Sequence, residues 1–271
     1  MRRAASLALA AVALAAVPAR ARPEPVPLKY DLQVDGAIAL GTWALYGASE
    51  LAKGSLAPTN CRWCAVNGLD AWARETFVLG YVDHAVTASD VLAYAIVPAG
   101  MVAHQVLAAR AAGDAREGWV DVLLVAEAAG IAMDVTQIVK FAAGRQRPFV
   151  HYGNYPSPGP RSDPDDNLSF YSGHTTFTFA VASAAGTIST LRGYRSAPWV
   201  WGVGLTLATA TGYLRIAGDK HYLTDVLMGA GTGIAAGIAI PRLLHPREDA
   251  AASGRPTMSV MAFPLGVSGV F

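Results

Sequence analysis

Long apolar runs separated by short polar turns dominate the chain. The runs are rich in Ala, Leu and Gly, and they lack the polar–apolar alternation and the β-branched stretches that mark strands. An all-α fold, built as a bundle of six helices, is therefore predicted. The six segments cover residues 32–51, 90–111, 119–141, 174–191, 199–214 and 225–244.

Each segment is close to the length of roughly 17 to 25 residues that spans a bilayer. Several segments nevertheless contain polar residues that a lipid-facing helix avoids. Glu127 and Asp134 in the third segment lie on nearly one stripe of a helix, and we expect this stripe to face the bundle interior. The pattern favours a membrane-embedded bundle, with a soluble exported bundle as the alternative.

The N-terminus has the three parts of a secretory signal. Two arginines precede an apolar run over residues 4–17, and Ala19 and Ala21 have the spacing of a cleavage site. An uncleaved anchor helix is the alternative, and either one sends the following residues across a membrane. We expect an exported protein, either in the inner membrane with a periplasm-facing site or soluble in the periplasm. The predicted parts are a signal peptide at 1–21, a Pro-rich linker at 22–30, a helical domain at 31–245 and a polar tail at 246–271, weakly strand-like from residue 258.

Composition excludes a disordered chain and disfavours a nucleic-acid partner. Hydrophobic residues make up 53% of the 271 residues and charged residues only 15%, which provides ample material for a packed core. The 21 Lys and Arg residues nearly balance the 20 Asp and Glu residues, so no global field attracts a polyanion. Any site for an anion must therefore be local.

The two cysteines, Cys61 and Cys64, lie close together in a polar stretch. The sequence has no second thiol pair to complete a four-thiolate zinc site, and it lacks the βαβ pattern that accompanies a redox pair. In an exported protein a small structural disulfide is the expected state. Because the pair is far in sequence from the polar clusters described next, we expect it to take no part in their chemistry.

The first of three polar clusters covers residues 140–148, at the end of the third segment. Gly144 is a plausible helix stop, and Arg147, which precedes a proline, is expected to be extended rather than helical. Lys140 and Arg147 would then present two cations at one helix end.

The second cluster, residues 169–176, opens the fourth segment. Ser172 is well suited to the N-cap position, which places Gly173 and His174 in the first turn. The free backbone amides and the positive end of the helix dipole at such a turn bind phosphate without any side-chain charge.

The third cluster, residues 213–225, adds a third cation, Arg215. Gly218 is expected to end one helix and Asp219 to cap the next, so that His221 falls in the first turn of the last segment. Asp225 follows four residues later, on the same helical face. A carboxylate beside an imidazole fixes its tautomer and raises its basicity, as a nucleophilic or general-base histidine requires.

A polar loop with four prolines, residues 151–168, separates the first two clusters. Such a loop is either a lid over a site or a simple connector. Its place between two motifs favours a lid.

Together the clusters offer three fixed cations, helix-end amides and two histidines, a set suited to phosphoryl transfer. In order and spacing they resemble the signature of the type 2 phosphatidic acid phosphatase and vanadium haloperoxidase superfamily: Lys, six residues, Arg-Pro; then Pro-Ser-Gly-His; then Ser-Arg, five residues, His, three residues, Asp. The resemblance covers residues 140–225 tightly, and the six segments resemble the family's six-helix core. Tyr171 replaces the usual proline and Leu214 the usual serine, which we expect to alter affinity rather than remove activity.

The resemblance implies a role for each motif residue. His221 attacks phosphorus and forms a phosphohistidine, Asp225 orients His221, and His174 protonates the leaving oxygen before it activates water. No metal or other cofactor is implied, since three cations can neutralise a phosphate dianion without Mg²⁺. The groups expected to hold the phosphate oxygens are Lys140, Arg147, Arg215, Ser172 and the amide of Gly173.

The activity implied is that of a metal-independent phosphatase acting on phosphate monoesters or diphosphates, of lipids or of small soluble molecules. One alternative keeps the same site but binds vanadate and oxidises halide with peroxide, as the superfamily's haloperoxidases do. The size of the chain and the short insertion between motifs favour the phosphatase. The other alternative is a non-catalytic membrane protein of the same fold, which would have little reason to retain both histidines and all three cations. The oligomeric state is not specified by the sequence.

Overall fold

The computed structural model of the chain describes residues 25–153 and 163–248, together with the backbone of 261–263 and 266–268. The predicted signal peptide at 1–21, the central part of the predicted lid and most of the polar tail lie outside the described residues. The two described pieces of the tail, β1 (Met261–Phe263) and β2 (Gly266–Ser268), pair as an antiparallel hairpin, in agreement with the weak strand pattern there.

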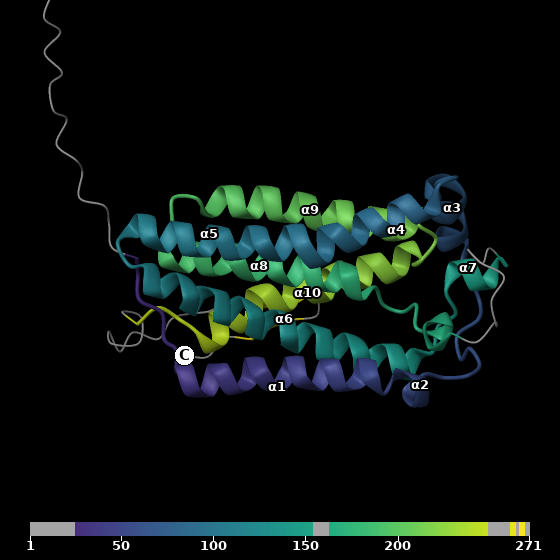
Figure 1. Cartoon of the computed structure of the whole chain (residues 1–271), viewed down its shortest axis with the longest axis horizontal. Coiled ribbons are helices and arrows are strands. Elements are labelled where there is room, and N and C mark those ends of the chain that lie inside the picture. Colours follow the sequence, from purple (N-terminus) through teal and green to yellow (C-terminus); the bar gives the residue numbers. More distant parts are fainter. Residues whose placement is uncertain (1–24, 154–162, 249–260, 264–265, 269–271) are drawn as a thin grey trace, which may run out of the picture.

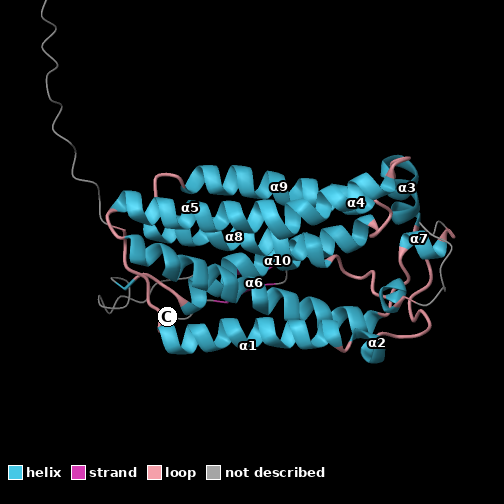
Figure 2. Cartoon of the chain, viewed as in Figure 1, coloured by secondary structure: helices cyan, strands magenta, loops and turns pink. Residues whose placement is uncertain are grey.

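Helices account for most of the rest of the described chain (Figure 2). Six long helical elements run side by side along the molecule, while the shorter helices gather at one end (Figure 1). Each predicted apolar segment falls within one long element, which confirms the all-α bundle. The long elements are α1 (Leu32–Leu51), the continuous rod of α4 (Val82–Val91), η1 (Leu92–Ile96) and α5 (Val97–Ala112), then α6 (Ala115–Ala143), α8 (Gly173–Arg192), α9 (Ala197–Ala217) and α10 (Leu223–Leu244). The short ones are α2 (Lys53–Leu56), α3 (Gly68–Phe77), α7 (Pro148–His151) and the 3₁₀ turn η2 (Pro164–Asn167).

The second long element begins eight residues before the predicted segment, because its first turns are polar. Between Val82 and Asp90 only a narrow face is buried, formed by Ala85 and Ser89. The other sides of this helix are exposed and polar, so the spacing of apolar residues alone does not reveal its helical period. A single π-type turn, η1, then joins α4 to α5 just after Asp90.

The core of the bundle forms where α6 and α8 face each other. Buried Leu124, Val125 and Ala128 of α6 pack with Ala180 and Ala184 of α8 in one apolar cluster. The small residues let the two backbones approach closely, as at interfaces between membrane helices.

Helix α10 approaches α8 even more closely through a row of glycines spaced by four residues. A Cβ atom placed on Gly229 would lie 2.7 Å from the carbonyl oxygen of Ser172, and one on Gly233 would lie 2.5 Å from that of Thr176. Gly237 faces the backbone of α8 in the same way. Since backbone cannot move aside as a flexible side chain can, this contact requires glycine. It fixes α10, which carries Asp225, against the N-terminal half of α8, which carries His174.

Among the described residues, three helical elements are long and apolar enough to cross a membrane: Val82–Ala112, Ala115–Ala143 and Leu223–Leu244. Large apolar side chains on the outside of the bundle include Leu40 and Leu107, which are 75% and 63% exposed. The expected burial of the Glu127 side of α6 is confirmed, since this carboxylate is fully buried, whereas Asp134 on the same stripe is half-buried.

We predict that Gly233→Ala destabilises the protein by about 1–3 kcal/mol, the usual cost of forcing extra atoms into a packed contact. Gly231 on the same helix has open space around its Cβ position and serves as the matched control. Gly231→Ala should leave stability unchanged or raise it by up to about 1 kcal/mol, since alanine favours helix more than glycine does. Thermal unfolding of both variants in the same detergent measures the difference. Equal stability of the two variants would contradict the close contact.

Candidate active site

The three polar clusters converge at the end of the bundle where the short helices gather. Helix α6 ends at Gly144, whose φ of +54° is a left-handed conformation that glycine adopts at low cost. Arg147 is extended, with φ −72° and ψ 152°, and precedes Pro148 at the start of α7. Both local predictions are confirmed.

Ser172 caps α8, as predicted, and its hydroxyl oxygen accepts a hydrogen bond from the amide of Thr175 at 3.4 Å. Lys140 reaches this helix end from α6: a Cβ atom placed on Gly173 would lie 3.3 Å from the Lys140 ammonium nitrogen. The absent side chain at Gly173 therefore leaves room for the lysine beside the amides of the first turn. A cation and a helix N-terminus face the same point, an arrangement that binds anions.

His221 lies just outside α10, not in its first turn as predicted. The N-cap is Tyr222, and Asp219 cannot take that role because its φ of +55° is far from the extended conformation that an N-cap adopts. The Asp219 carboxylate instead pairs with Arg74 of α3 at 2.7 Å. Gly218 does end α9, as predicted.

The Nδ1 atom of His221 lies 2.8 Å from the backbone carbonyl of Ser169. A carbonyl only accepts hydrogen bonds, so Nδ1 carries the proton and Nε2 is left with its lone pair. The side chain is almost fully buried. Burial and the nearby charges of Arg147 and Arg215 hold the pKa of His221 well below its usual value, so the ring is neutral near pH 7.

Asp225 is positioned beside His221 but acts on it mainly through Ser169. Its Oδ2 atom lies 3.6 Å from Nδ1 of His221, beyond hydrogen-bond range. The same oxygen accepts the Ser169 hydroxyl at 2.5 Å and the amide of Tyr222 at 3.0 Å. Because the Ser169 carbonyl in turn accepts from His221, the carboxylate orients the imidazole through one intervening residue.

His174 and Arg215 meet at a carboxylate that the sequence patterns did not single out. Asp90 of α4 lies 2.8 Å from Nε2 of His174 and 3.2 Å from a guanidinium nitrogen of Arg215. Arg215 also donates to the hydroxyl of Ser89 at 3.1 Å. In the sequence, Asp90 is the first residue of the second apolar segment, at its border with a polar stretch, and that position alone does not indicate a site.

A second carboxylate, Asp165, holds the cations on the other side of the site. The Arg147 guanidinium donates to the Asp165 backbone carbonyl at 2.8 Å and lies 3.5 Å from its carboxylate, which also pairs with Lys53 at 3.1 Å. Although burial alone would raise it, the charges of Arg147 and Lys53 hold the pKa of Asp165 well below its usual range. Asp165 belongs to the predicted lid, whose residues 154–162 lie outside the described chain.

Arg145 is a further residue that the motif analysis passed over, although it stands inside the first cluster. Its buried guanidinium pairs with Asp70 of α3 and with Asp225 of α10, each at 2.6 Å. The rings of Trp63 and Tyr222 cover it, with centroids 4.2 and 4.1 Å away. This arginine therefore connects three chain segments immediately behind His221.

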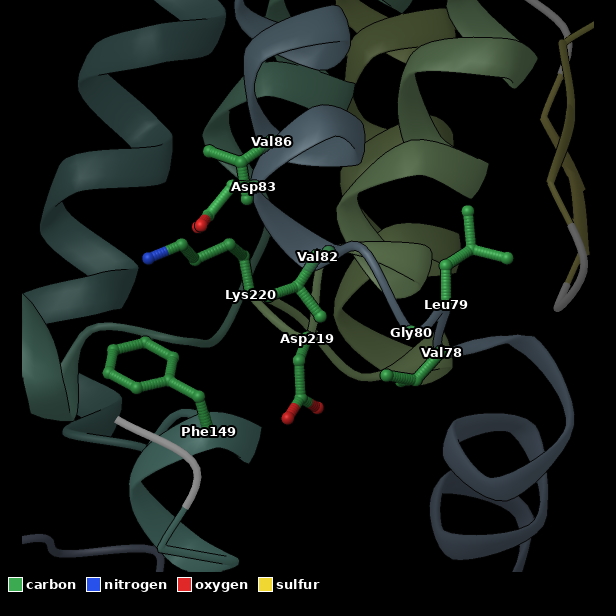
Figure 3. Close-up of a pocket in the computed structure, with 10 residues that line it drawn as sticks. Val78, Leu79, Gly80, Val82, Asp83, Val86, Phe149, Asp219 and Lys220 are labelled. Carbon is green, nitrogen blue, oxygen red and sulfur yellow. The ribbon is translucent and has the colours of Figure 1, made fainter. Parts of the chain in front are cut away.

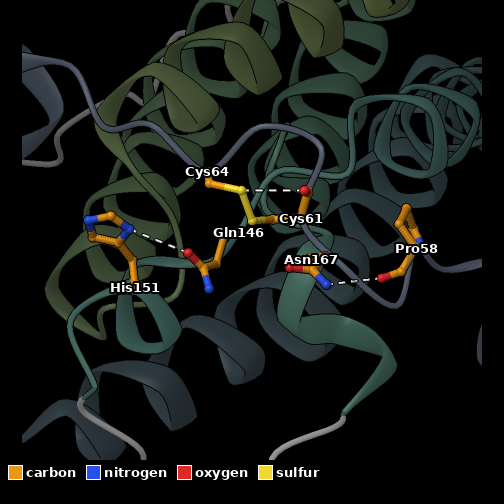
Figure 4. Close-up of a disulfide and its surroundings, with 6 residues drawn as sticks. All are labelled: Pro58, Cys61, Cys64, Gln146, His151 and Asn167. Carbon is orange, nitrogen blue, oxygen red and sulfur yellow. Dashed lines mark hydrogen bonds between the residues drawn. A yellow bond between two sulfur atoms is a disulfide. The ribbon is translucent and has the colours of Figure 1, made fainter.

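Cys61 and Cys64 are joined in a disulfide, as expected (Figure 4). Their loop nevertheless packs directly on the first cluster: the amide of Arg62 donates to the Gly144 carbonyl at 2.9 Å, and the amide of Gln146 donates to the Trp63 carbonyl at 3.1 Å. The cysteine pair is thus far from the first cluster in sequence but close to it in space. The disulfide loop supports the backbone that carries Arg145 and Arg147.

A cavity of about 280 Å³ opens beside the site (Figure 3). Lys220, the neighbour of His221, lines it together with Val82 and Val86 of α4 and Phe149 of α7. Burial and the charges of Arg147 and Arg215 lower the pKa of Lys220. Apolar side chains form most of the lining, and the carboxylates of Asp83 and Asp219 join Lys220 as its charged groups.

Fold and site together define a helical bundle that gathers three cations and two histidines at one end. Residues 121–249 match the family model of the PAP2 superfamily, a match that includes all three polar clusters. The chain is 33% identical over 117 residues to the lipid A 1-phosphatase of Porphyromonas gingivalis, an alignment that covers 42% of this chain and 22% of that protein. The crystal structure of a transmembrane PAP2-type phosphatidylglycerolphosphate phosphatase from Bacillus subtilis matches 82% of this chain and 98% of its own, with 16% identity and a TM-score of 0.45.

We predict that Arg145→Met destabilises the protein by about 3–5 kcal/mol, because it leaves two buried carboxylates without their counter-charge. Arg62→Met is the matched control: Arg62 is exposed, and its guanidinium donates to the backbone carbonyls of Phe141 and Ala142 rather than to a carboxylate. The control should lose less than about 1 kcal/mol, as surface substitutions do. Thermal unfolding and retention of activity in detergent would be measured for both. Similar losses in the two variants would show that Arg145 does not hold the site together.

Proposed function

We propose that the chain is a metal-independent phosphatase that hydrolyses a phosphate monoester or diphosphate of a lipid through a phosphohistidine on His221. The observation that carries this proposal is the tautomer of His221. With its proton on Nδ1 held by the Ser169 carbonyl, the Nε2 lone pair is available for attack in a buried pocket that three cations share. Such an imidazole is both neutral and oriented, which are the two requirements of a nitrogen nucleophile.

In the first step Nε2 of His221 attacks phosphorus, the N–P bond forms and the bond to the leaving oxygen breaks. Lys140, Arg147 and Arg215, with the amides at the start of α8, neutralise the charge on the remaining phosphoryl oxygens. His174 gives its Nε2 proton to the leaving oxygen. In the structure that nitrogen faces Asp90, so the substrate has to take the place of this carboxylate.

In the second step a water molecule attacks the phosphohistidine and the N–P bond breaks. His174, now neutral, takes a proton from the water, and inorganic phosphate leaves. His221 regains its free Nε2, and its Nδ1 keeps its proton and donates it to the Ser169 carbonyl throughout. Asp225 and Ser169 stabilise the positive charge that the ring carries in the intermediate.

A lipid substrate is supported by the surroundings of the site. The identity to a protein named lipid A 1-phosphatase points to this class, and the apolar cavity beside Lys220 offers room for part of a leaving group. Exposed aromatic side chains stand near both ends of the bundle: Trp119 and Trp199 at one end, 61% and 75% exposed, and Tyr81 at the other, 77% exposed. Aromatic residues at such positions are typical of the two interfaces of a membrane. The predicted signal peptide and the disulfide favour the periplasmic side.

We predict that the mature chain remains in the membrane fraction after washes with high salt and with alkaline carbonate. Screening and loss of surface charge do not release helices whose apolar faces lie in lipid. The measurement is the share of the protein in the pellet after each wash, compared with a soluble periplasmic marker. Recovery of most of the chain in the wash would favour the soluble exported form.

We predict that the two histidines differ in their dependence on the leaving group. His221→Ala should abolish the phosphoenzyme burst with every substrate, since each must pass through this nitrogen. His174→Ala should slow phosphoenzyme formation from an alkyl phosphate by about 10² to 10⁴, the usual contribution of a general acid. With p-nitrophenyl phosphate the loss should be much smaller, because nitrophenolate leaves without a proton. Rapid-quench measurement separates this step from the later hydrolysis.

His151→Ala is the matched control, since the side chain of this exposed histidine, within the described part of the chain, contacts Gln146 and Tyr152. It should behave as the wild type with both substrates. Equal losses for both substrates in His174→Ala would exclude His174 as the acid, and a normal burst in His221→Ala would exclude the mechanism. Stoichiometric vanadium with bromide oxidation and no phosphate release would favour a haloperoxidase instead.

A further inference from the structure

Away from the active site, three side chains with metal-ligating atoms meet inside the bundle. Asp35 comes from the first turn of α1, Glu127 from the middle of α6, and His245 follows the last residue of α10. One ligand atom from each lies within 4.8 Å of the other two. All three are buried, with exposed fractions of 6%, 0% and 1%. These residues are far from Lys140 and His221 along their helices, so the cluster is separate from the proposed phosphatase site.

The hydrogen bonds of His245 leave one ring nitrogen directed at the two acids. Its Nδ1 atom lies 3.1 Å from the backbone carbonyl of Lys29 and therefore carries a proton. The Nε2 atom then faces Oε2 of Glu127 at 3.2 Å. A histidine that ligates a metal usually donates its other ring N–H to a carbonyl or carboxylate in this way, which fixes the ring and its tautomer.

The charges of the cluster do not balance without a cation. Glu127 and Asp35 bring two buried carboxylates, and among the described residues neither pairs with a lysine or an arginine. The second oxygen of Glu127, Oε1, has no hydrogen-bond partner within the described part of the chain, although it is fully buried. A buried, unpartnered carboxylate oxygen is costly unless a positive ion or a proton compensates it.

We propose that Asp35, Glu127 and His245 form a structural site for a divalent transition-metal ion of the Zn²⁺ type. One imidazole nitrogen and two carboxylates are ligands that such ions accept, with distances of about 2.0–2.2 Å to each. Ligand atoms around a tetrahedral ion at those distances are roughly 3.4 Å apart. The 3.2 Å between Nε2 of His245 and Oε2 of Glu127 fits this spacing, and all three ligand atoms lie within 4.8 Å of one another. The free Oε1 of Glu127 supplies a further donor.

A proton on Nε2 of His245 is the competitor of the metal ion. An imidazole nitrogen that ligates a metal must be deprotonated, so binding of the ion displaces this proton. A buried ion pair that does not bind metal would release no proton when metal is added.

The ion would lie where the segment before the first long helix meets the segment after the last one. The segment before α1 already pairs with the segment after α10: Leu28 bridges Arg247, and the amide of Lys29 donates to the Pro246 carbonyl at 2.9 Å. Metal bonds from Asp35, Glu127 and His245 would tie this junction to α6. Since only the folded chain brings the three ligands together, binding should raise the unfolding temperature.

The test uses the full chain purified in detergent, stripped with a strong chelator and titrated with Zn²⁺ in competition with a chromophoric chelator. We expect one equivalent per chain, a rise in the unfolding temperature that depends on Zn²⁺ concentration, and proton release on binding. Glu127→Gln and His245→Gln should each weaken binding by more than the roughly 10- to 100-fold typical of losing an outer-shell partner.

Two controls separate the site from its surroundings. Asp31→Asn changes the neighbouring N-cap of α1 but retains a capping side chain, and should leave Zn²⁺ binding unchanged. His174→Ala removes a histidine of the phosphatase site and should also leave it unchanged. The proposal is overturned if the wild type binds no equivalent of Zn²⁺, or if Glu127→Gln binds as the wild type does. In either outcome the cluster is a buried imidazolium–carboxylate pair. Whether the chain hydrolyses phosphate esters does not affect this readout.

Discussion

The guanidinium of Arg145 is buried between the carboxylates of Asp70 and Asp225, and the placement of the site depends on this network. A charge so far from water is stable only while both partners and their hydrogen bonds remain in place. Arg145 thereby fixes α3 and the start of α10 against the loop after α6. Asp225, held in turn, fixes the Ser169 hydroxyl, and the Ser169 carbonyl fixes the ring of His221. The orientation of the buried His221 ring thus depends on the ion pair between Arg145 and Asp225.

Close backbone contact supplies the second constraint. Because α10 lies on α8 through Gly229, Gly233 and Gly237, the turn that carries His221 and the helix end that carries His174 cannot drift apart. The amide of Ser172 also donates to the Asp225 carbonyl at 3.1 Å, directly joining the two helix starts. Packing along the helices and ion pairing at their ends act on the same few residues. A rigid bundle therefore holds the side chains of the site in fixed positions.

Sequence patterns predicted those features that depend on neighbouring residues along the chain. Apolar runs located the six long helices, and the Gly144 stop, the Ser172 cap and the extended Arg147 follow from local backbone preferences. The prediction for the turn before α10 was wrong because Asp219 could serve either as a helix cap or as the partner of an arginine. Asp219 is a good cap by residue type, but its carboxylate is drawn to Arg74 of α3, a partner 145 residues away.

Contacts between distant segments explain the rest of what was missed. Asp90 became part of the site only because the fold brings α4 beside Arg215 and the start of α8. Arg145 stood inside a recognised motif, yet nothing in its neighbours along the chain indicates that it is buried between two acids. The motif residues themselves were found because the family spacing encodes this three-dimensional arrangement indirectly. Their catalytic roles stay predictions.

The electrostatics of the proposed active site suit a pocket that must stay folded while empty and still bind a dianion. Lys140, Arg147 and Arg215 repel one another in a buried space, and Asp90 and Asp165 partly offset that repulsion. Both acids are anchored at the rim, with side chains 45% and 40% exposed, so they can return to water at little cost. Under the proposed function a phosphoryl group, with more charge and more acceptor oxygens, would take their place. In the empty site the two carboxylates would then occupy the place of the phosphoryl group. The cations would need no rearrangement when the substrate binds.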